Sequence, residues 1–289
     1  MSAVAALGLA LTAVVLAWPV PRLMARHEGF RASPRPALVV WQAVSLSAVL
    51  AALLAAPVGV RFVAHPDKPL TDHLWVILAV AASAAMLARL LVSGHRVGTR
   101  LRSVRRRHRE LVDVLATRGD AQLRVLEHPT VTAYCLPGLR QRVILTAGTM
   151  ERLDADELAA VLAHERAHLR ARHDLVLEFF TVLHEAVPRP VRSHTALQEV
   201  RLLVEVLADR RAARTVGELP MARALVALAG GHHPEAMLGA SGRPSAAQIR
   251  LGLLGATQRV DVAQSTVMFV FAVAVVSLPL VIAAWGWTA

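Results

Sequence analysis

Residues 154–169 read DADELAAVLAHERAHL, and they predict an amphipathic helix from which the rest of the chain can be interpreted. Asp154, followed three positions later by Glu157, is an acidic analogue of a capping box and marks the start of this helix. Apolar residues then recur at the spacing of one helical face, and Glu165 interrupts that face. Because burying an unpaired carboxylate is costly, the glutamate needs a functional reason to be there.

The pattern His164-Glu165-Arg166-Ala167-His168 supplies such a reason. Two histidines one turn apart can hold one zinc ion, and the glutamate between them can take a proton from a water at the metal. The short pattern also arises by chance in long chains, and this chain has 13 histidines. The interpretation therefore needs a third protein ligand elsewhere in the chain.

A second predicted helix, over about residues 197–214, offers that ligand. Glu205 would complete the set, and Asp209, one turn later, can accept a hydrogen bond from the second ring nitrogen of a ligand histidine. Glu199 is the rival ligand, but Leu203 stands one turn after it and cannot accept such a bond. The metal ligands that the sequence favours are His164, His168 and Glu205.

Four apolar stretches are each close to the roughly 20 residues that cross a bilayer. They cover about residues 3–20, 37–60, 74–92 and 265–287. They account for a hydrophobic fraction of 55% and a mean hydropathy of +0.47, which exceed those of ordinary soluble domains. No basic residue precedes the first stretch and no small-residue cleavage site follows it, so we expect a retained span and not a signal peptide.

The placement of arginines predicts the orientation in the membrane. The loop after the first stretch carries four arginines and residues 96–109 carry seven, whereas the second loop has only Arg61 and Lys68. Since basic loops stay in the cytoplasm, we expect the first and third loops inside and both termini outside. The net charge of +11 is then a topology signal, and no nucleic-acid partner is expected, because a single tyrosine cannot provide a basic surface interleaved with aromatic residues.

The expected fold class is an α-helical membrane protein with an α+β cytoplasmic domain and four transmembrane helices in a 3+1 arrangement. Residues 1–95 would hold three spans, residues 96–264 the cytoplasmic domain, and residues 265–289 the fourth span. The domain would open with a basic helix and become mainly helical after Asp154. Between these parts, short strands are expected at residues 123–126, 131–134 and 142–146.

Several single residues have less specific surroundings. Cys135 is the only cysteine, which excludes an intrachain disulfide and a cysteine-based zinc site, and we expect a small buried residue. We expect His173 to be a surface helix residue. His184 is expected to be a packing residue that can assist the chemistry, with Tyr134 as a weaker candidate. Residues 130–133 resemble an edge strand with which an extended substrate could pair.

A family resemblance rests on two segments, His164–His168 and Glu205–Asp209, which look like the paired signatures of glutamate-ligand zinc peptidases. Among these gluzincins the chain most resembles the BlaR/MecR-type membrane zinc metallopeptidases, which are relatives of HtpX and of the CAAX-prenyl proteases. Arg172 and Asp174, and the stretch from His184 to Pro188, are similar to that family, as is the layout of the spans. The resemblance implies a zincin-like cytoplasmic domain with one Zn²⁺ per chain.

What the resemblance implies about function is a zinc endopeptidase in a bacterial plasma membrane, with a protein substrate in the cytoplasm. The leading substrate is a transcriptional repressor of the BlaI type, cleaved in a signalling response. The alternatives are quality control of membrane proteins, as in HtpX, and a scaffold that does not cleave. The presence of Glu165 and Asp209 argues against the scaffold. Family receptors carry a penicillin-binding sensor domain after the fourth span, whereas this sequence ends at Ala289, so we do not extend the resemblance to β-lactam sensing.

Overall fold

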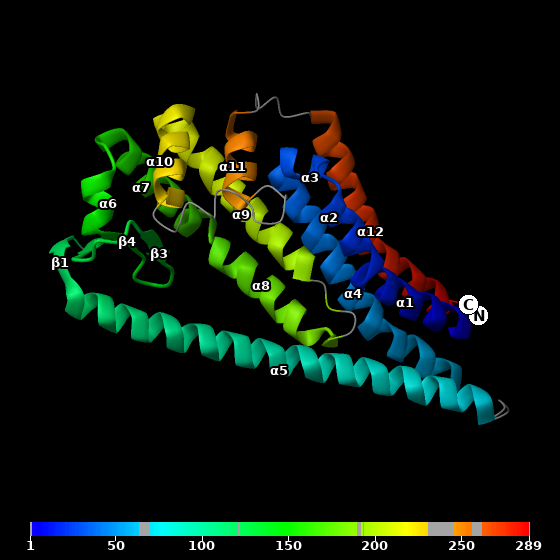
Figure 1. Cartoon of the computed structure of the whole chain (residues 1–289). Helices are drawn as coiled ribbons and strands as arrows, with labels where there is room; N and C mark the ends of the chain where they lie inside the picture. Colours follow the sequence, from blue (N-terminus) through cyan, green and yellow to red (C-terminus); the bar gives the residue numbers. More distant parts are fainter. Residues whose placement is uncertain are drawn as a thin grey trace. The chain divides into compact units, whose positions relative to one another are not determined.

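The computed structural model describes residues 2–63, 70–120, 122–189, 192, 194–230, 245–255 and 262–288. In this part the chain is mostly helical with one small sheet (Figure 1), as the sequence predicts. It divides into two compact units, each of them assembled from separate segments. Unit 1 consists of Met1–Val97, Phe179–Val200 and Val260–Ala289, and unit 2 of Gly98–Glu178 and Arg201–Arg259.

The expectation of four long apolar helices is confirmed. They cover Val4–Arg26, Pro34–Val60, Leu74–Leu115 and Val262–Thr288, and each is long and apolar enough to cross a membrane. Length and composition therefore indicate a multi-pass membrane protein. Residues 64–69, which include Lys68 of the second loop, lie outside the described part of the chain.

Small side chains hold unit 1 together. α1 (Ser2–Ala17), α4 (Pro34–Val63) and α12 (Val262–Thr288) pack through a core of alanines, Leu9 and Val58. A Cβ added to Gly286 would come within 2.6 Å of the Ala5 Cβ atom, so only glycine permits this approach. Close packing of small residues is how helices associate in lipid, where no hydrophobic force drives them together. Two short helices, α2 (Pro19–Arg26) and α3 (Gly29–Ala32), connect α1 to α4.

The third span and the basic segment form one helix of 46 residues, α5 (Leu70–Leu115). The sequence predicted that the domain of residues 96–264 opens with a basic helix. No proline interrupts residues 70–115, and the isolated Gly94 and Gly98 cost too little to end a helix. The helix therefore continues unbroken from its apolar segment into its basic segment.

The sheet of unit 2 has the strand order β1-β2-β4-β3, with β2 and β4 parallel and the outer pairs antiparallel. The bounds are β1 Ala116–Gly119, β2 Leu123–Leu126, β3 Ala133–Leu136 and β4 Arg142–Thr146. The predictions for β2 and β4 are confirmed, whereas β3 begins two residues later than predicted and β1 was not predicted. Thr132 explains the later start, because its amide donates to the Thr149 hydroxyl at 2.7 Å instead of entering the ladder.

In the described part of the chain, six helices lie between the sheet and α12, and their packing fixes the two that carry the candidate metal ligands. Their bounds are α6 Ala147–Arg152, α7 Ala155–Ala171, α8 His173–Ala186, α9 His194–Val216, α10 Glu218–Gly230 and α11 Ala246–Gly255. Leu145 of β4, Val161 of α7, Ala212 of α9, Met221 of α10 and Leu254 of α11 belong to one buried core. The sequence placed residues 179–200 in the domain of residues 96–264, whereas in the structure they pack in unit 1 with the apolar helices.

Candidate metal centre

Both ends of α7 are set by local interactions. Asp154 caps its first turn by accepting from the Glu157 amide at 2.8 Å, while the Glu157 carboxylate accepts from the Asp154 amide at 3.1 Å. The predicted capping box is therefore confirmed. At the other end Arg172 adopts a left-handed conformation, with φ 51° and ψ 43°, and its amide bonds back to the carbonyl groups of His168 and Leu169. The chain turns there and starts α8.

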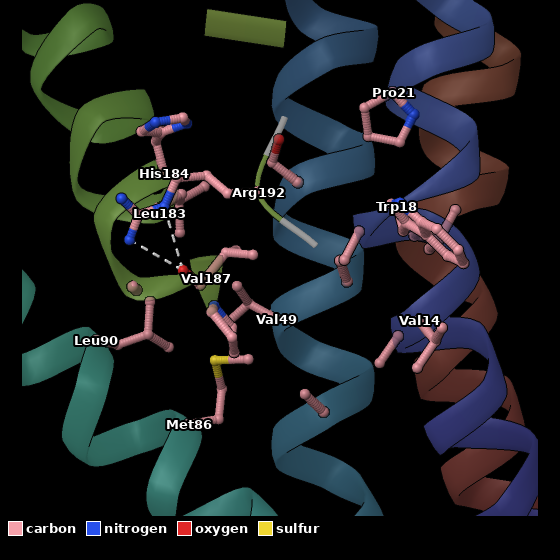
Figure 2. Close-up of a pocket in the computed structure, with 18 of the residues that line it drawn as sticks. Val14, Trp18, Pro21, Val49, Met86, Leu90, Leu183, His184, Val187 and Arg192 are labelled. Atoms are coloured by element: carbon pink, nitrogen blue, oxygen red, sulfur yellow. Dashed lines mark hydrogen bonds between the residues drawn. The ribbon is translucent and has the colours of Figure 1, made fainter. Parts of the chain in front are cut away.

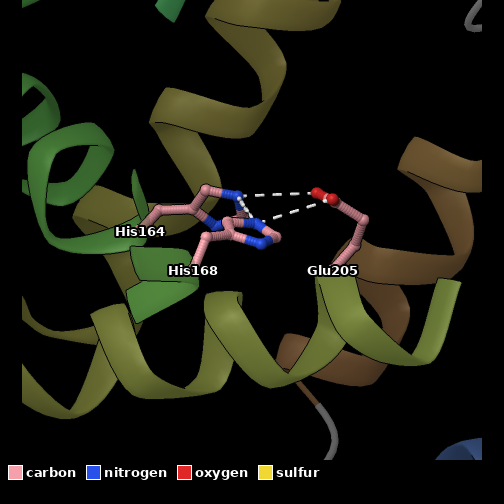
Figure 3. A group of neighbouring side chains, drawn as sticks. All are labelled: His164, His168 and Glu205. Carbon is pink, nitrogen blue, oxygen red and sulfur yellow. Dashed lines mark hydrogen bonds and ion pairs between the residues drawn. The ribbon is translucent and has the colours of Figure 1, made fainter. Parts of the chain in front are cut away.

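His164 and His168 of α7 meet Glu205 of α9 within unit 2 (Figure 3). The Nε2 atoms of His164 and His168 lie 3.0 Å apart, and each is 3.5 Å from a carboxylate oxygen of Glu205. Two ligand atoms held at about 2.0–2.1 Å by a tetrahedral zinc ion are about 3.4 Å apart. The spacing and the type of these three donors therefore fit zinc, and the set leaves a fourth position for water or substrate.

A carboxylate and an arginine support one side of this cluster. Nδ1 of His164 lies 2.9 Å from Oδ1 of Asp209, which is buried one turn after Glu205 on α9. Arg250 of α11 donates two hydrogen bonds to the Asp209 carboxylate, from Nε at 2.7 Å and from Nη2 at 2.6 Å. Its Nη1 is also 3.1 Å from Glu205. The sequence predicted the place of Asp209 but not Arg250, which comes from a helix with no signature of its own.

These contacts set the charge states of the cluster. Burial alone would lower the pKa of His164, but the carboxylates of Asp209 and Glu205 outweigh it and raise this pKa to about 9. Burial alone would raise the pKa of Glu205, yet His164 and Arg250 bring it down to about 2. Burial and the neighbouring His164 lower the pKa of His168 to about 4. At neutral pH, Glu205 is therefore ionised and His168 neutral, the states that bind a metal cation, and binding at His164 releases its proton.

His173 is not the surface residue that the sequence predicted. It is buried, and its Nδ1 atom lies 3.0 Å from Nδ1 of His168. On an uninterrupted helix, positions five apart point in different directions, but the left-handed turn at Arg172 brings this ring back against His168. Each candidate ligand histidine thus has a partner at Nδ1, which leaves Nε2 for the metal.

Glu165 is buried between the sheet and the metal cluster. The thiol of Cys135 on β3 donates a hydrogen bond to its carboxylate. Burial raises the pKa of Glu165, with smaller opposing contributions from His164 and from the thiol. Burial, followed by the nearby Glu165 charge, also raises the pKa of Cys135, so this half-buried cysteine is a neutral thiol and not a nucleophile.

The remaining candidates have other partners. Glu199, the rival ligand, lies in unit 1 and accepts two bonds from Arg31, at 3.0 Å from Nε and 2.5 Å from Nη2. His184 is also in unit 1, where its ring contacts that of His194. The Tyr134 hydroxyl lies 2.7 Å from Nε2 of His108. Among the three acidic residues of the α9 helix that we considered, the structure brings Glu205 and Asp209 to the histidines.

Comparison with known proteins agrees with this chemistry. Residues 99–188 match the model of peptidase family M48. The matched region contains the sheet, α6, α7 with His164, Glu165 and His168, and α8. No curated protein and no solved structure matches the chain.

This region is therefore similar to the M48 metallopeptidases, a family of zinc metalloproteases. Together with the four apolar helices, the match supports a membrane-associated metallopeptidase. The region that matches ends before Glu205 and Asp209, so the third ligand rests on the geometry alone.

Arg250→Gln is expected to weaken zinc binding by about 10- to 100-fold, the usual effect of losing a group that orients a metal ligand. The change leaves the buried Asp209 and the adjacent Glu205 without their cation, so both carboxylates are free to turn and repel each other. Zinc affinity measured by competition with a chelator checks this. Arg211→Gln, an exposed arginine on α9, is the control. If Arg250→Gln binds zinc as tightly as this control, Arg250 does not support the site.

Proposed function

We propose that the chain is a membrane-embedded, zinc-dependent endopeptidase that cleaves a cytoplasmic protein, with a transcriptional repressor of the BlaI type as its substrate. The observation that carries the proposal is the cluster of His164, His168 and Glu205 beside the buried Glu165. The match of residues 99–188 to a peptidase family supports the reaction class. The resemblance of the metal segments to BlaR/MecR-type peptidases supports the substrate.

In this proposal each side chain of the cluster has a role. His164, His168 and Glu205 would hold the zinc ion, which would supply Lewis acidity to a water and to the scissile carbonyl group. Glu165 would accept a proton from the attacking water as the water oxygen bonds to the carbonyl carbon, and would then give this proton to the amine nitrogen as the C–N bond breaks. Burial, which raises the pKa of Glu165, makes its carboxylate a better acceptor of the proton in the first step.

The edge of the sheet offers a place for the substrate backbone. β3 is the last strand in the order β1-β2-β4-β3, and its residue Cys135 contacts Glu165. An extended peptide that adds to β3 by main-chain hydrogen bonds would run beside the proposed base. Such pairing demands little of the substrate sequence, so the recognised feature would be an unfolded or extended segment.

We place the enzyme in the plasma membrane with its metal centre in the cytoplasm and both termini outside. The basis is the asymmetry of positive charge, with seven arginines between residues 96 and 109 against Arg61 and Lys68 in the second loop. A cytoplasmic metal centre and a cytoplasmic repressor are mutually consistent. Membrane lipid is the other partner that the four apolar helices imply.

The test compares the native host carrying the wild type with the same host carrying Glu165→Gln, under cell-wall antibiotic stress. The expected result is one repressor-sized cytoplasmic protein that is shortened only when Glu165 is intact, seen by mass spectrometry of protein termini. Fragments drawn mainly from membrane proteins would instead indicate quality control of the HtpX kind. Fragments confined to proteins outside the cytoplasm would show that the orientation is wrong. The same fragments in both strains would leave the scaffold as the better interpretation.

A further inference from the structure

The end of α8 packs against a membrane-spanning helix, although residues 179–200 are not among the four apolar spans. Within unit 1, the Arg89 Nε atom donates to the Ala186 carbonyl at 2.6 Å, and the Ser93 hydroxyl donates to the Val182 carbonyl at 2.7 Å. Arg89 lies inside the apolar stretch 74–92 of α5, and Ser93 follows it. The last two turns of α8 therefore lie along the end of the third span.

A cavity of about 400 Å³ lies between this part of α8 and the spans (Figure 2), within the size range of small-ligand sites. Its walls are almost entirely apolar. They include Ala13 of α1, Val49 and Ala52 of α4, Ala82 of α5, Leu183 of α8, and Val187 directly after α8. Because the residues from α1, α4 and α5 all lie within predicted spans, the cavity lies at the depth of the bilayer, and so does the end of α8.

The carbonyl groups at the end of α8 have hydrogen-bond partners that do not depend on water. The last carbonyl groups of a helix have no partner within the helix, and in hydrocarbon an unsatisfied carbonyl is costly. Here arginines bind them: Arg89 reaches the Ala186 carbonyl, while Arg192 reaches those of Glu185 at 3.0 Å and Val187 at 3.1 Å. An arginine at membrane depth is itself costly and usually marks a functional place.

Positive charge and an aromatic residue stand at the cavity. Arg192 and Trp18 both line it, and the guanidinium of Arg22 lies 5.1 Å from the centre of the Trp18 ring. Tryptophan is enriched at the level of lipid headgroups, and basic pockets between spans bind anionic headgroups. Arginine has five N–H donors, so Arg192 can hold its carbonyl groups and a phosphate together.

We propose that this cavity binds one phospholipid, with an acyl chain among α4, α5 and α8 and an anionic phosphate at Arg192 and Arg22. Because the apolar walls lie at the depth of the bilayer, we expect a hydrocarbon chain as the occupant. The two cations select a negatively charged headgroup over a zwitterionic one. The site is independent of the zinc chemistry, so its test needs no substrate and no turnover.

The experiment uses the full chain in phosphatidylcholine nanodiscs that contain a little phosphatidylglycerol with a photoreactive diazirine on its acyl chain. After illumination, mass spectrometry is expected to find the label on the α8 peptide around Val187. Ala82→Phe, which fills the cavity from α5, should lower this labelling at least fivefold. Ala85→Phe is the matched control, because Ala85 is exposed on the same helix and does not line the cavity. Ala52→Leu fills the cavity from α4 and decides the matter if Ala82→Phe does not fold.

The headgroup is tested with the same diazirine chain on phosphatidylcholine. Wild type should label several-fold less with this probe, and Arg192→Gln should bring the two probes to the same level. Equal labelling by both probes in wild type would overturn the anionic class. An unlabelled α8 peptide, or equal labelling of Ala82→Phe and Ala85→Phe, would overturn the site itself. Zinc content, measured in parallel, shows whether each variant has kept unit 2 folded.

Discussion

Glu165→Gln is expected to retain zinc and the native fold, yet to lose roughly two to four orders of magnitude in the rate of peptide hydrolysis, the usual contribution of a general base. Glutamine is nearly isosteric and still accepts the hydrogen bond from Cys135, but it cannot take a proton from water. Glu165 is not one of the three residues that would hold the metal, so its replacement should remove the catalytic step and leave zinc binding intact.

The measurement is cleavage of a casein-like substrate by purified protein in detergent with zinc restored. Asp156→Asn is the matched control, since Asp156 is an exposed carboxylate in the first turn of the same helix. Cleavage at the wild-type rate by Glu165→Gln would show that another group is the base. If no protein cleaves in detergent, the comparison moves to the stressed native host, where an activating signal is present.

Glu205→Ala is expected to lose zinc almost completely, with an affinity reduced more than the roughly 10- to 100-fold that follows loss of an orienting group. Two histidines alone leave the ion without its anionic ligand, and Arg250, whose Nη1 lies 3.1 Å from Glu205, then keeps only Asp209 as a carboxylate partner. The zinc content of purified protein, measured by elemental mass spectrometry, gives the result directly.

Glu199→Ala is the matched control for Glu205→Ala. It removes a carboxylate from the same helix, and with it the ion pair to Arg31 in unit 1, but it should keep one zinc per chain. The opposite pattern, with zinc kept by Glu205→Ala and lost by Glu199→Ala, would show that the third ligand has been assigned wrongly.

Features that depend on neighbouring residues in the sequence could be predicted. The capping box at Asp154 is local, as are the strands over 123–126 and 142–146 and the four apolar helices, because each is read from composition or spacing. The positions of Glu205 and Asp209 could also be predicted, since one turn of helix separates them and both chemical roles need a carboxylate.

Features that depend on a single backbone turn or on a distant helix could not. His173 reaches His168 only because Arg172 has a positive φ, and nothing in the sequence marks a non-glycine residue for that conformation. Arg250 is one of many arginines in a basic chain, and only the packing of α11 distinguishes it. β1 lacks the alternation of a strand and forms because β2 provides a partner.

The packing of α12 against α1 and α4 has a consequence for synthesis of the protein. A ribosome makes α1 and α4 first, then all the residues of unit 2, and α12 only after residue 261. The alanine-lined contact at Gly286 cannot form until that last segment has entered the bilayer. The metal ligands are thus translated before the packing of unit 1 can be completed. In the interval, every residue of unit 2 has been synthesised, while unit 1 still lacks α12.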